Sequence, residues 1–360
     1  MNLISKSEHK AMIYWLLAGC LLIYIMVLVG GLIRLTHSGL SITDWSFMGS
    51  VPPLNEDMWQ QRFAKYQQSP EFEKINYSMS LEEFKPIFWW EYIHRMIGRT
   101  MMYVFALGFV YFLIKGKIKK NMWPSFVLLF VMGALQAVIG WWMVYSGLQK
   151  QPAVSHYRLA THLMSAFTLF AFTFWFALQL IYPKQDVMQK VPLKLKGISV
   201  TFFFLLILQI IYGAFTAGYV EGDAAHIRPG HIFNTWPKMG DQWMADQVTM
   251  KGTFLQNILE NASGIQFVHR MLAVVLVVVL MILWAHSNKT GVTKTQEQGI
   301  TLLIYGVTVQ FILGVLTLLY NVPVVLGAMH QTGAFFLFGS SIFLLFHLFN
   351  NTSKSLERTN

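Results

Sequence analysis

The sequence predicts an all-α integral membrane protein in which eight transmembrane helices form two similar four-helix bundles. Three observations lead to this prediction: the composition, the distribution of charge, and an internal repeat. Hydrophobic residues make up 55% of the 360 residues, and the mean hydropathy is +0.47. Charged residues make up 12%, against roughly 25% in soluble domains. This composition excludes both a soluble globular domain and a disordered chain.

Eight apolar runs are each long enough to cross the hydrocarbon core of a bilayer, which takes about 20 residues. They cover residues 12–33, 88–114, 123–146, 157–182, 197–218, 265–286, 299–320 and 324–349. The first run lacks a small-residue cleavage site and is longer than a signal-peptide core, so we expect it to be retained. The single cysteine, Cys20, lies within it, which excludes an internal disulfide and a cysteine-based metal site.

The charged residues are divided unequally between the two sides of the membrane. The termini and the short connectors on one side carry 14 of the 27 Lys and Arg residues and four of the 17 acids, which leaves 13 of each sign on the other side. The positive-inside rule places the lysine-rich side, with both termini, in the cytoplasm. We expect a bacterial inner membrane, because no mitochondrial presequence is evident. The cations flank the apolar runs, so the net charge of +10 does not indicate nucleic-acid binding.

The two halves of the chain resemble each other, which predicts a parallel repeat of two four-helix bundles. The segment EYIHRM at residues 91–96 matches QFVHRM at residues 266–271. In the third span of each half a Gln precedes a Gly by four residues (Gln136 and Gly140, Gln310 and Gly314). We expect bundles over residues 1–183 and 184–360, with outer connectors at 34–87 and 219–264. Both connectors contain Trp, Pro and Gly, so we expect structured lids.

Four histidines lie at matching positions in the repeat: His94, His162, His269 and His330. Ionisable residues inside a span are costly and indicate function. Two imidazoles on opposite faces of a haem can ligate its iron, and the residue four positions after each histidine is small, which leaves room for the ring. These small residues are Gly98, Ala166, Ala273 and Ala334. In the alternative interpretation, small residues pack helices together and the histidines hydrogen-bond between them.

The seven other histidines are weaker candidates for a direct role in the site. Direct roles are open for those in outer loops or at helix edges, which are His37, His156, His226 and His231. Those near the inner boundary are expected to be interfacial, namely His9, His286 and His347.

The repeat breaks at one informative position, where Glu91 corresponds to Gln266. Each lies three residues before a histidine and so shares a helical face with it. Gln has nearly the shape of Glu but cannot exchange a proton. The difference predicts that the first half carries out chemistry, with Glu91 as its acid or base, and that the second passes electrons. In the alternative interpretation, Glu91 forms an ion pair with Arg95 or Arg99.

Several arginines lie near the outer ends of the spans. Their guanidinium groups could bind haem propionates or extend to lipid headgroups. The set comprises Arg34, Arg95, Arg99, Arg158 and Arg270.

The chain resembles the haem A synthase family over nearly its whole length. The motifs include GGLIRLT at 30–36, SGLSI at 38–42, Trp45, PPL at 52–54, EFK at 83–85, IFWWE at 87–91, HR at 94–95, GR at 98–99, VHR at 268–270 and HQ at 330–331. The chain lacks the cysteine pair that one branch carries in an outer loop. It is therefore similar to the branch of Gram-negative bacteria and mitochondria, and a thiol-based mechanism does not apply.

The resemblance implies oxidation of the C8 methyl group of haem O to a formyl group, which gives haem A for terminal oxidases. It implies that His269 and His330 bind a haem b cofactor, that His94 and His162 hold the substrate haem, and that Glu91 is essential beside it. The implied partners are the haem O synthase and an electron donor or acceptor. Two other classes stay open: a bis-histidine membrane cytochrome without enzymatic activity, and a haem transporter or chaperone.

Overall fold

The structure is a computed structural model of the chain, and it describes residues 9–44, 51–149, 152–182, 191–220 and 228–350. Trp45 and His226 lie outside the described residues. The described part is helical, and its only extended pairing is an isolated bridge between Met239 and Gln242.

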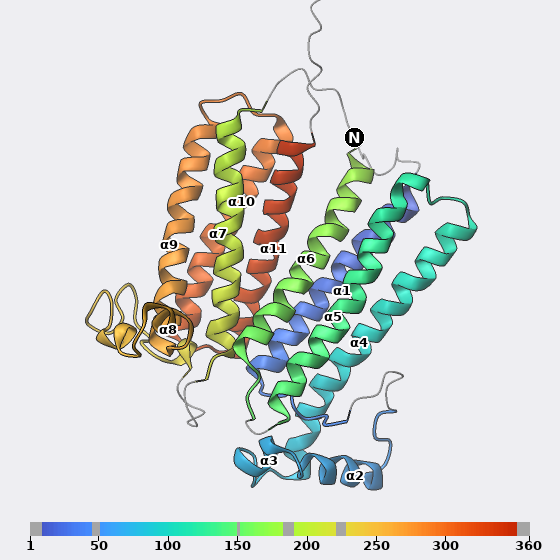
Figure 1. The fold of residues 1–360 in the computed structure, drawn as a ribbon, viewed down its shortest axis with the longest axis vertical. Helices are drawn as coiled ribbons and strands as arrows, with labels where there is room; N and C mark the ends of the chain where they lie inside the picture. The colour runs from blue at the N-terminus through green and yellow to red at the C-terminus, as the bar shows by residue number, and fades with distance from the viewer. Residues whose placement is uncertain (1–8, 45–50, 150–151, 183–190, 221–227, 351–360) are drawn as a thin grey trace, which may run out of the picture.

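Eight helices are long and apolar enough to cross a membrane, which confirms the eight predicted spans. They are α1 (Lys10–Leu35), α4 (Leu81–Ile114), α5 (Trp123–Gly147, preceded by the 3-10 turn η2, Lys120–Met122), α6 (His156–Ile181), α7 (Leu193–Gly218), α9 (Ala262–Ser287), α10 (Lys294–Leu319) and α11 (Val324–Phe349). The start of α1 and the end of α11 lie at the same end of the molecule (Figure 1). The orientation in the membrane stays a prediction.

One helix begins earlier than its apolar run. α4 begins at Leu81, seven residues before the predicted start at 88. Ser80 accepts a hydrogen bond from the Glu83 amide, and the Glu83 carboxylate accepts one from the Ser80 amide, so a capping box fixes the helix start. The added turns bury Phe84, which packs with Phe88 at the predicted start against the outer connector.

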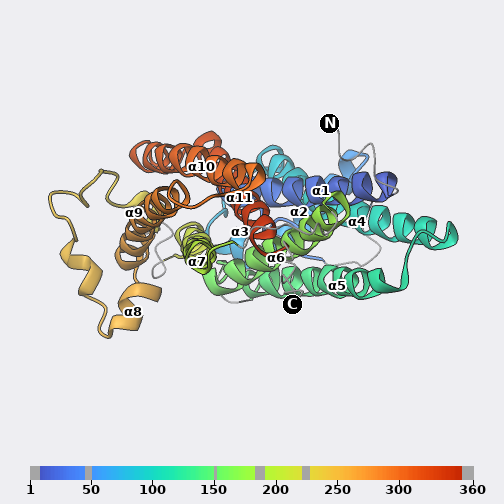
Figure 2. The ribbon, with the colours of Figure 1, turned by 90° about the horizontal axis from the view of Figure 1, so that it is seen from above.

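Corresponding helices of the two halves make corresponding contacts. In the first half α1 packs on α4 and α6, and α5 packs on α6; in the second half α7 packs on α9 and α11, and α10 packs on α11. The halves meet where α6 contacts α7 and α11 and where α1 contacts α11, and Figure 2 shows these helices at the centre between the two groups. This packing agrees with the predicted repeat, while the functional division at residue 183 stays a prediction.

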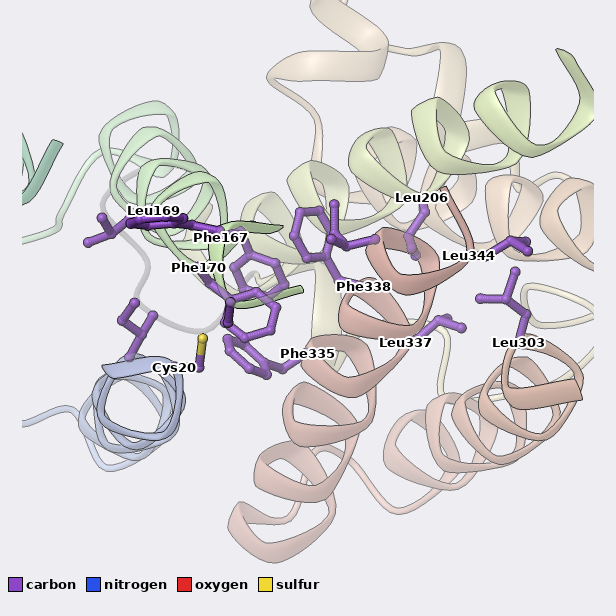
Figure 3. Close-up of a cluster of buried hydrophobic side chains, with 14 of the residues drawn as sticks. Cys20, Phe167, Leu169, Phe170, Leu206, Leu303, Phe335, Leu337, Phe338 and Leu344 are labelled. Atoms are coloured by element: carbon purple, nitrogen blue, oxygen red, sulfur yellow. The ribbon is translucent and has the colours of Figure 1, made fainter. Parts of the chain in front are cut away.

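The centre between the halves is filled by aromatic rings. Phe167 and Phe170 of α6 lie against Phe335 and Phe338 of α11, with ring centroids 4.4 to 6.4 Å apart (Figure 3). Lipid tails are as apolar as these side chains, so close packing rather than removal from water stabilises such a contact. It holds the two halves at a fixed separation.

Both outer connectors are structured, as predicted. The first contains α2 (Glu56–Tyr66) and α3 (Pro70–Lys74), and the second contains η3 (Pro229–His231), η4 (Asp246–Thr249) and α8 (Phe254–Leu259). The first connector has its own core, in which Trp59, Phe63 and Tyr66 pack against the first turns of α4. Figure 1 places α2, α3 and α8 at the end opposite the start of α1.

Candidate functional site

A single large cavity brings the four predicted histidines together. Its volume is about 1490 Å³, and side chains from all eight spanning helices line it. Pockets for one small molecule measure roughly 300–1,000 Å³, so this cavity has room for more than one ligand. His94, His162, His269 and His330 all lie on its wall.

The histidines on α6 and α11 each lie against a glycine of the neighbouring helix. A Cβ atom at Gly140 would lie 2.8 Å from Cε1 of His162, and one at Gly314 would lie 2.9 Å from Cε1 of His330. Real Cβ atoms essentially never come this close. The Gln-x-x-x-Gly pattern of the third span therefore provides the space in which each imidazole sits.

The histidines on α4 and α9 also lie beside a glycine, but at ordinary van der Waals distance. A Cβ at Gly30 of α1 would lie 3.4 Å from Nε2 of His94, and one at Gly213 of α7 would lie 3.4 Å from Cε1 of His269. Sequence analysis did not assign a role to either glycine. Their equivalent places in the first span of each half were the signal that could have found them.

Glutamines hold the histidine backbones and rings. Gln136 Nε2 donates to the His162 carbonyl at 3.1 Å, and Gln310 Nε2 donates to the His330 carbonyl at 2.9 Å. Gln209, which sequence analysis missed, places its Nε2 3.4 Å from Nε2 of His269. Such partners fix the orientation of a metal-ligating imidazole.

The histidine sites fit a haem. Nδ1 of His269 and Nδ1 of His330 are buried and lack a hydrogen-bond partner among the described residues, and a buried nitrogen of this kind is free to ligate a metal. The two rings are close enough to interact electrostatically, as are those of His94 and His162. The four small residues predicted to make room for a ring, Gly98, Ala166, Ala273 and Ala334, all line the cavity. The described residues hold no cluster of three His, Cys, Asp or Glu side chains suited to another metal.

Glu91 also lines the cavity and is 4% exposed. Its Oε2 accepts hydrogen bonds from Ser41 Oγ at 2.8 Å and the Ile42 amide at 2.9 Å. Its Oε1 accepts from Arg95 Nη2 at 2.6 Å and Nε at 3.1 Å. Glu91 therefore forms an ion pair with Arg95, one of the two predicted alternatives. Its carboxylate nevertheless lies at the cavity wall.

Gln266 lies at the equivalent place but makes the opposite kind of contact. Its Nε2 donates to the carbonyls of Pro229, at 2.7 Å, and Ile232. The second connector thus presents carbonyls where the first presents an amide and a hydroxyl. An amide side chain suits the second half and a carboxylate suits the first.

The predicted arginines divide into three groups. Arg95 donates to the carbonyls of Ile42 and Asp44, and Arg270 donates to those of Phe233 and Lys238, so each holds its own connector. These two arginines also line the cavity, as do Arg34 and Arg99. Arg158 is not among the lining residues; it donates to the Trp142 carbonyl at 2.9 Å, and its guanidinium carbon lies 4.4 Å from the Trp142 ring centroid.

Four further histidines lie outside the two pairs. His37 and His231 line the outer part of the cavity, whereas His156 bridges α6 to the carbonyl of Leu259 at 3.2 Å. His347 is 7% exposed and packs on Tyr182 and Phe343.

The first connector contains a buried acid that sequence analysis missed. Glu71 of α3 is 7% exposed and accepts a hydrogen bond from Tyr66 Oη at 3.2 Å. Burial, with a smaller contribution from the charge of Glu91, raises the pKa of Glu71 to about 7. Nothing in the local sequence marks it, because its burial depends on how α3 packs.

Comparison with known proteins identifies the family to which the chain belongs. The chain is 43% identical to the haem A synthase of Flavobacterium johnsoniae over 348 residues, which cover 95% of this chain and 99% of that protein. It is 39% identical to the haem A synthase of Nitrosospira multiformis, over 94% of this chain and 93% of that one. It is 41% identical to the haem A synthase COX15 of Arabidopsis thaliana, over 96% of this chain and 76% of the plant protein. Residues 13–342 match the family described as cytochrome oxidase assembly protein (COX15-CtaA), and the chain belongs to this family.

Proposed function

We propose that this protein is a haem A synthase, which oxidises a methyl group of bound haem O to the formyl group of haem A. Relatives of that name match nearly the whole chain at 37–43% identity. The observation that carries the proposal is an asymmetry within one cavity. Both halves present a histidine pair, but among the described residues that line the cavity the one carboxylate, Glu91, lies beside the first pair.

In this proposal His94 and His162 hold the iron of haem O, the substrate. His269 and His330 bind a resident haem b. Among the described residues Nδ1 of each of these histidines is buried without a hydrogen-bond partner, which suits a permanent iron ligand. When bound, haem b supplies a one-electron carrier for the oxidation. A Cβ at Gly140 or Gly314 would collide with the imidazole of His162 or His330, so the protein reserves space for one ring of each pair.

The proposed role of Glu91 is to accept protons that leave the methyl carbon as it is oxidised. With water as the source of the oxygen atom, conversion of a methyl to a formyl group releases four electrons, which pass to the external acceptor, and four protons. A positioned base speeds the removal of these protons. Ser41 and the Ile42 amide hold Oε2, and Arg95 holds Oε1. The carboxylate therefore has a fixed position at the cavity wall.

The protein spans a membrane, and its matched relatives include bacterial haem A synthases. We place it in the inner membrane of a bacterium, with Glu91 and the histidines toward the periplasmic side. That position puts haem O within reach from the bilayer. The proposed partners are a haem O synthase and an external electron donor or acceptor.

The test is expression in cells that make haem O but lack their own haem A synthase, followed by extraction of the haems and mass analysis. We expect a formylated haem that is absent from cells carrying the empty vector. Bound but chemically unaltered haem would contradict the proposal and would favour a bis-histidine cytochrome or a haem transporter.

A further inference from the structure

Four basic side chains gather at the outer end of the seam between the halves. Arg34 and His37 lie at and just after the end of α1, while Arg228 and His231 belong to the second connector. All four line the cavity that holds the histidine pairs. The cluster is therefore built jointly by both halves at the edge of the cavity, where His37 and His231 are exposed and Arg34 and Arg228 are half-buried.

The helix register places this cluster one turn outward from two of the histidines. Arg34 follows Gly30, the residue against His94, by four positions on α1. Ala217 follows Gly213, the residue against His269, by four positions on α7, and its carbonyl accepts a hydrogen bond from Arg34 Nε at 2.7 Å. Four helical residues span about 6 Å. Arg34 thus lies at nearly the same distance beyond a histidine of each half.

The cluster is positive, and among the described residues no carboxylate forms an ion pair with it. Arg228 Nη1 lies 3.2 Å and 3.1 Å from the two ring nitrogens of His37, and Arg228 Nε is buried without a hydrogen-bond partner among the described residues. Burial, followed by the charges of Arg228, Arg34 and His231, lowers the pKa of His37 to about 4. Within the described ranges, no ion pair involves Arg34 or Arg228; the acid that faces Arg34 electrostatically is Glu71.

Arg34 and Arg228 contact only carbonyl groups and the His37 ring among the described residues, so this cluster suits negatively charged groups. A carboxylate matches the planar donor pattern of a guanidinium, and each haem carries two propionates. A haem ligated at the level of His94 and one ligated at the level of His269 would both have an edge within reach of the seam. Because the cluster faces the cavity, a haem carboxylate fits it better than a lipid headgroup.

We propose that Arg34, Arg228 and His231 form a shared carboxylate site that binds one propionate from each haem. This inference rests on the proposed function, because it requires two haems in the cavity. Each propionate would reduce the repulsion between the two guanidinium groups. The site would then couple the two haems, so that binding of one changes the affinity for the other by the same factor in both directions.

The test uses the purified holoprotein in detergent and titrates it with haem O and with haem O dimethyl ester, which has no free carboxylate. We expect the ester to bind roughly ten- to a hundredfold more weakly, as for loss of a charge-assisted hydrogen bond. Arg228→Gln should remove most of this difference, and Arg228→Lys should restore part of it. Arg158→Gln is the matched control, because Arg158 lies outside the cavity wall, and it should leave the difference intact.

The midpoint potential of the resident haem is the second measurement. Removal of a cation beside a propionate favours the ferric form, so we expect a lower potential in Arg228→Gln and an unchanged one in Arg158→Gln. An ester that binds as tightly as haem O, or a potential that is equal in Arg228→Gln and the parent protein, would overturn the shared site. So would a result in which Arg228→Gln alters only the binding of phosphatidylglycerol vesicles, since that indicates a lipid-headgroup site.

These outcomes are separate from the proposed function. If haem O binds with the expected ester difference but is never formylated, the enzymatic proposal fails and the carboxylate site stands. If haem A forms and the ester binds equally well, the site fails and the enzymatic proposal stands.

Discussion

Glu91 and Gln266 occupy equivalent places in the repeat but contact their outer connectors with opposite hydrogen-bond polarity. Glu91 accepts from an amide and a hydroxyl of the first connector, whereas Gln266 donates to two carbonyls of the second. Each side chain therefore anchors a lid over the cavity. Glu91 can also exchange a proton, whereas Gln266 cannot. Glu91 thus holds its connector and can serve as the proposed base.

Glu91→Gln should reduce haem A formation roughly 10²- to 10⁴-fold, the usual contribution of a general base. The amide oxygen can still accept from Ser41 and Ile42, so the fold and the resident haem should persist. Haem A is measured in extracts at equal amounts of membrane protein and equal b-type absorption. A variant that keeps its haem b and makes haem A at the normal rate would show that the carboxylate has no role in the reaction.

Gln266→Glu should loosen the second connector. The new carboxylate would face the carbonyls of Pro229 and Ile232 without a donor, and a buried unsatisfied polar group costs about 1–3 kcal/mol, or more when charged. We expect faster proteolysis within residues 228–261. Gln247→Glu, at an exposed position of the same connector, is the control and should be cleaved at the parent rate. Equal cleavage of both variants would contradict the anchoring role.

His269→Met and His330→Met should each lower the haem b content while the membrane-spanning fold persists. His94→Met should instead leave haem b in place and weaken binding of haem O, because it belongs to the other pair. Reduced-minus-oxidised absorption measures the first effect, and titration with haem O measures the second. Unchanged b-type absorption in both second-half variants would refute the assignment of the halves.

Gly140→Ala and Gly314→Ala test the space reserved for the imidazoles. A Cβ would come within 2.8 to 2.9 Å of the ring carbon of His162 or His330, so the ring must move. We expect Gly140→Ala to weaken haem O binding and Gly314→Ala to lower haem b content. Gly197→Ala is the control, since a Cβ there meets no atom within 4 Å and Gly197 does not line the cavity. Normal haem contents in both variants would show that the rings tolerate displacement.

Glu71 should make the first connector less stable as the pH rises. Its pKa lies at about 7 in the folded protein against 4.5 for an ordinary Glu, so between these values the folded state binds more protons than the unfolded one. The free energy of unfolding of this segment therefore falls from pH 4.5 to 7 and then levels off. Limited proteolysis at pH 5 and pH 8 measures this, and Glu71→Gln should flatten the dependence. The parent protein and Glu71→Gln showing the same dependence would assign it to another group.

Local composition and residue spacing are enough to predict the spans, the repeat and the position at which the two halves differ. Eight apolar runs fix eight spans, because a bilayer requires about 20 apolar residues for each crossing. The matched segments around His94 and His269 reveal the repeat, and the change from Glu91 to Gln266 shows where the halves differ. Such signals are readable because charge and histidine are rare inside spans.

Which side chains meet across helices depends on the packing of the whole chain. The contact of Gly140 with His162, the bond from Arg34 to Ala217, and the burial of Glu71 join residues whose separation no sequence period predicts. Without water in the bilayer core, helices associate through close packing and hydrogen bonds, and these depend on the relative rotation and depth of whole helices. The cavity and its basic seam follow from that packing.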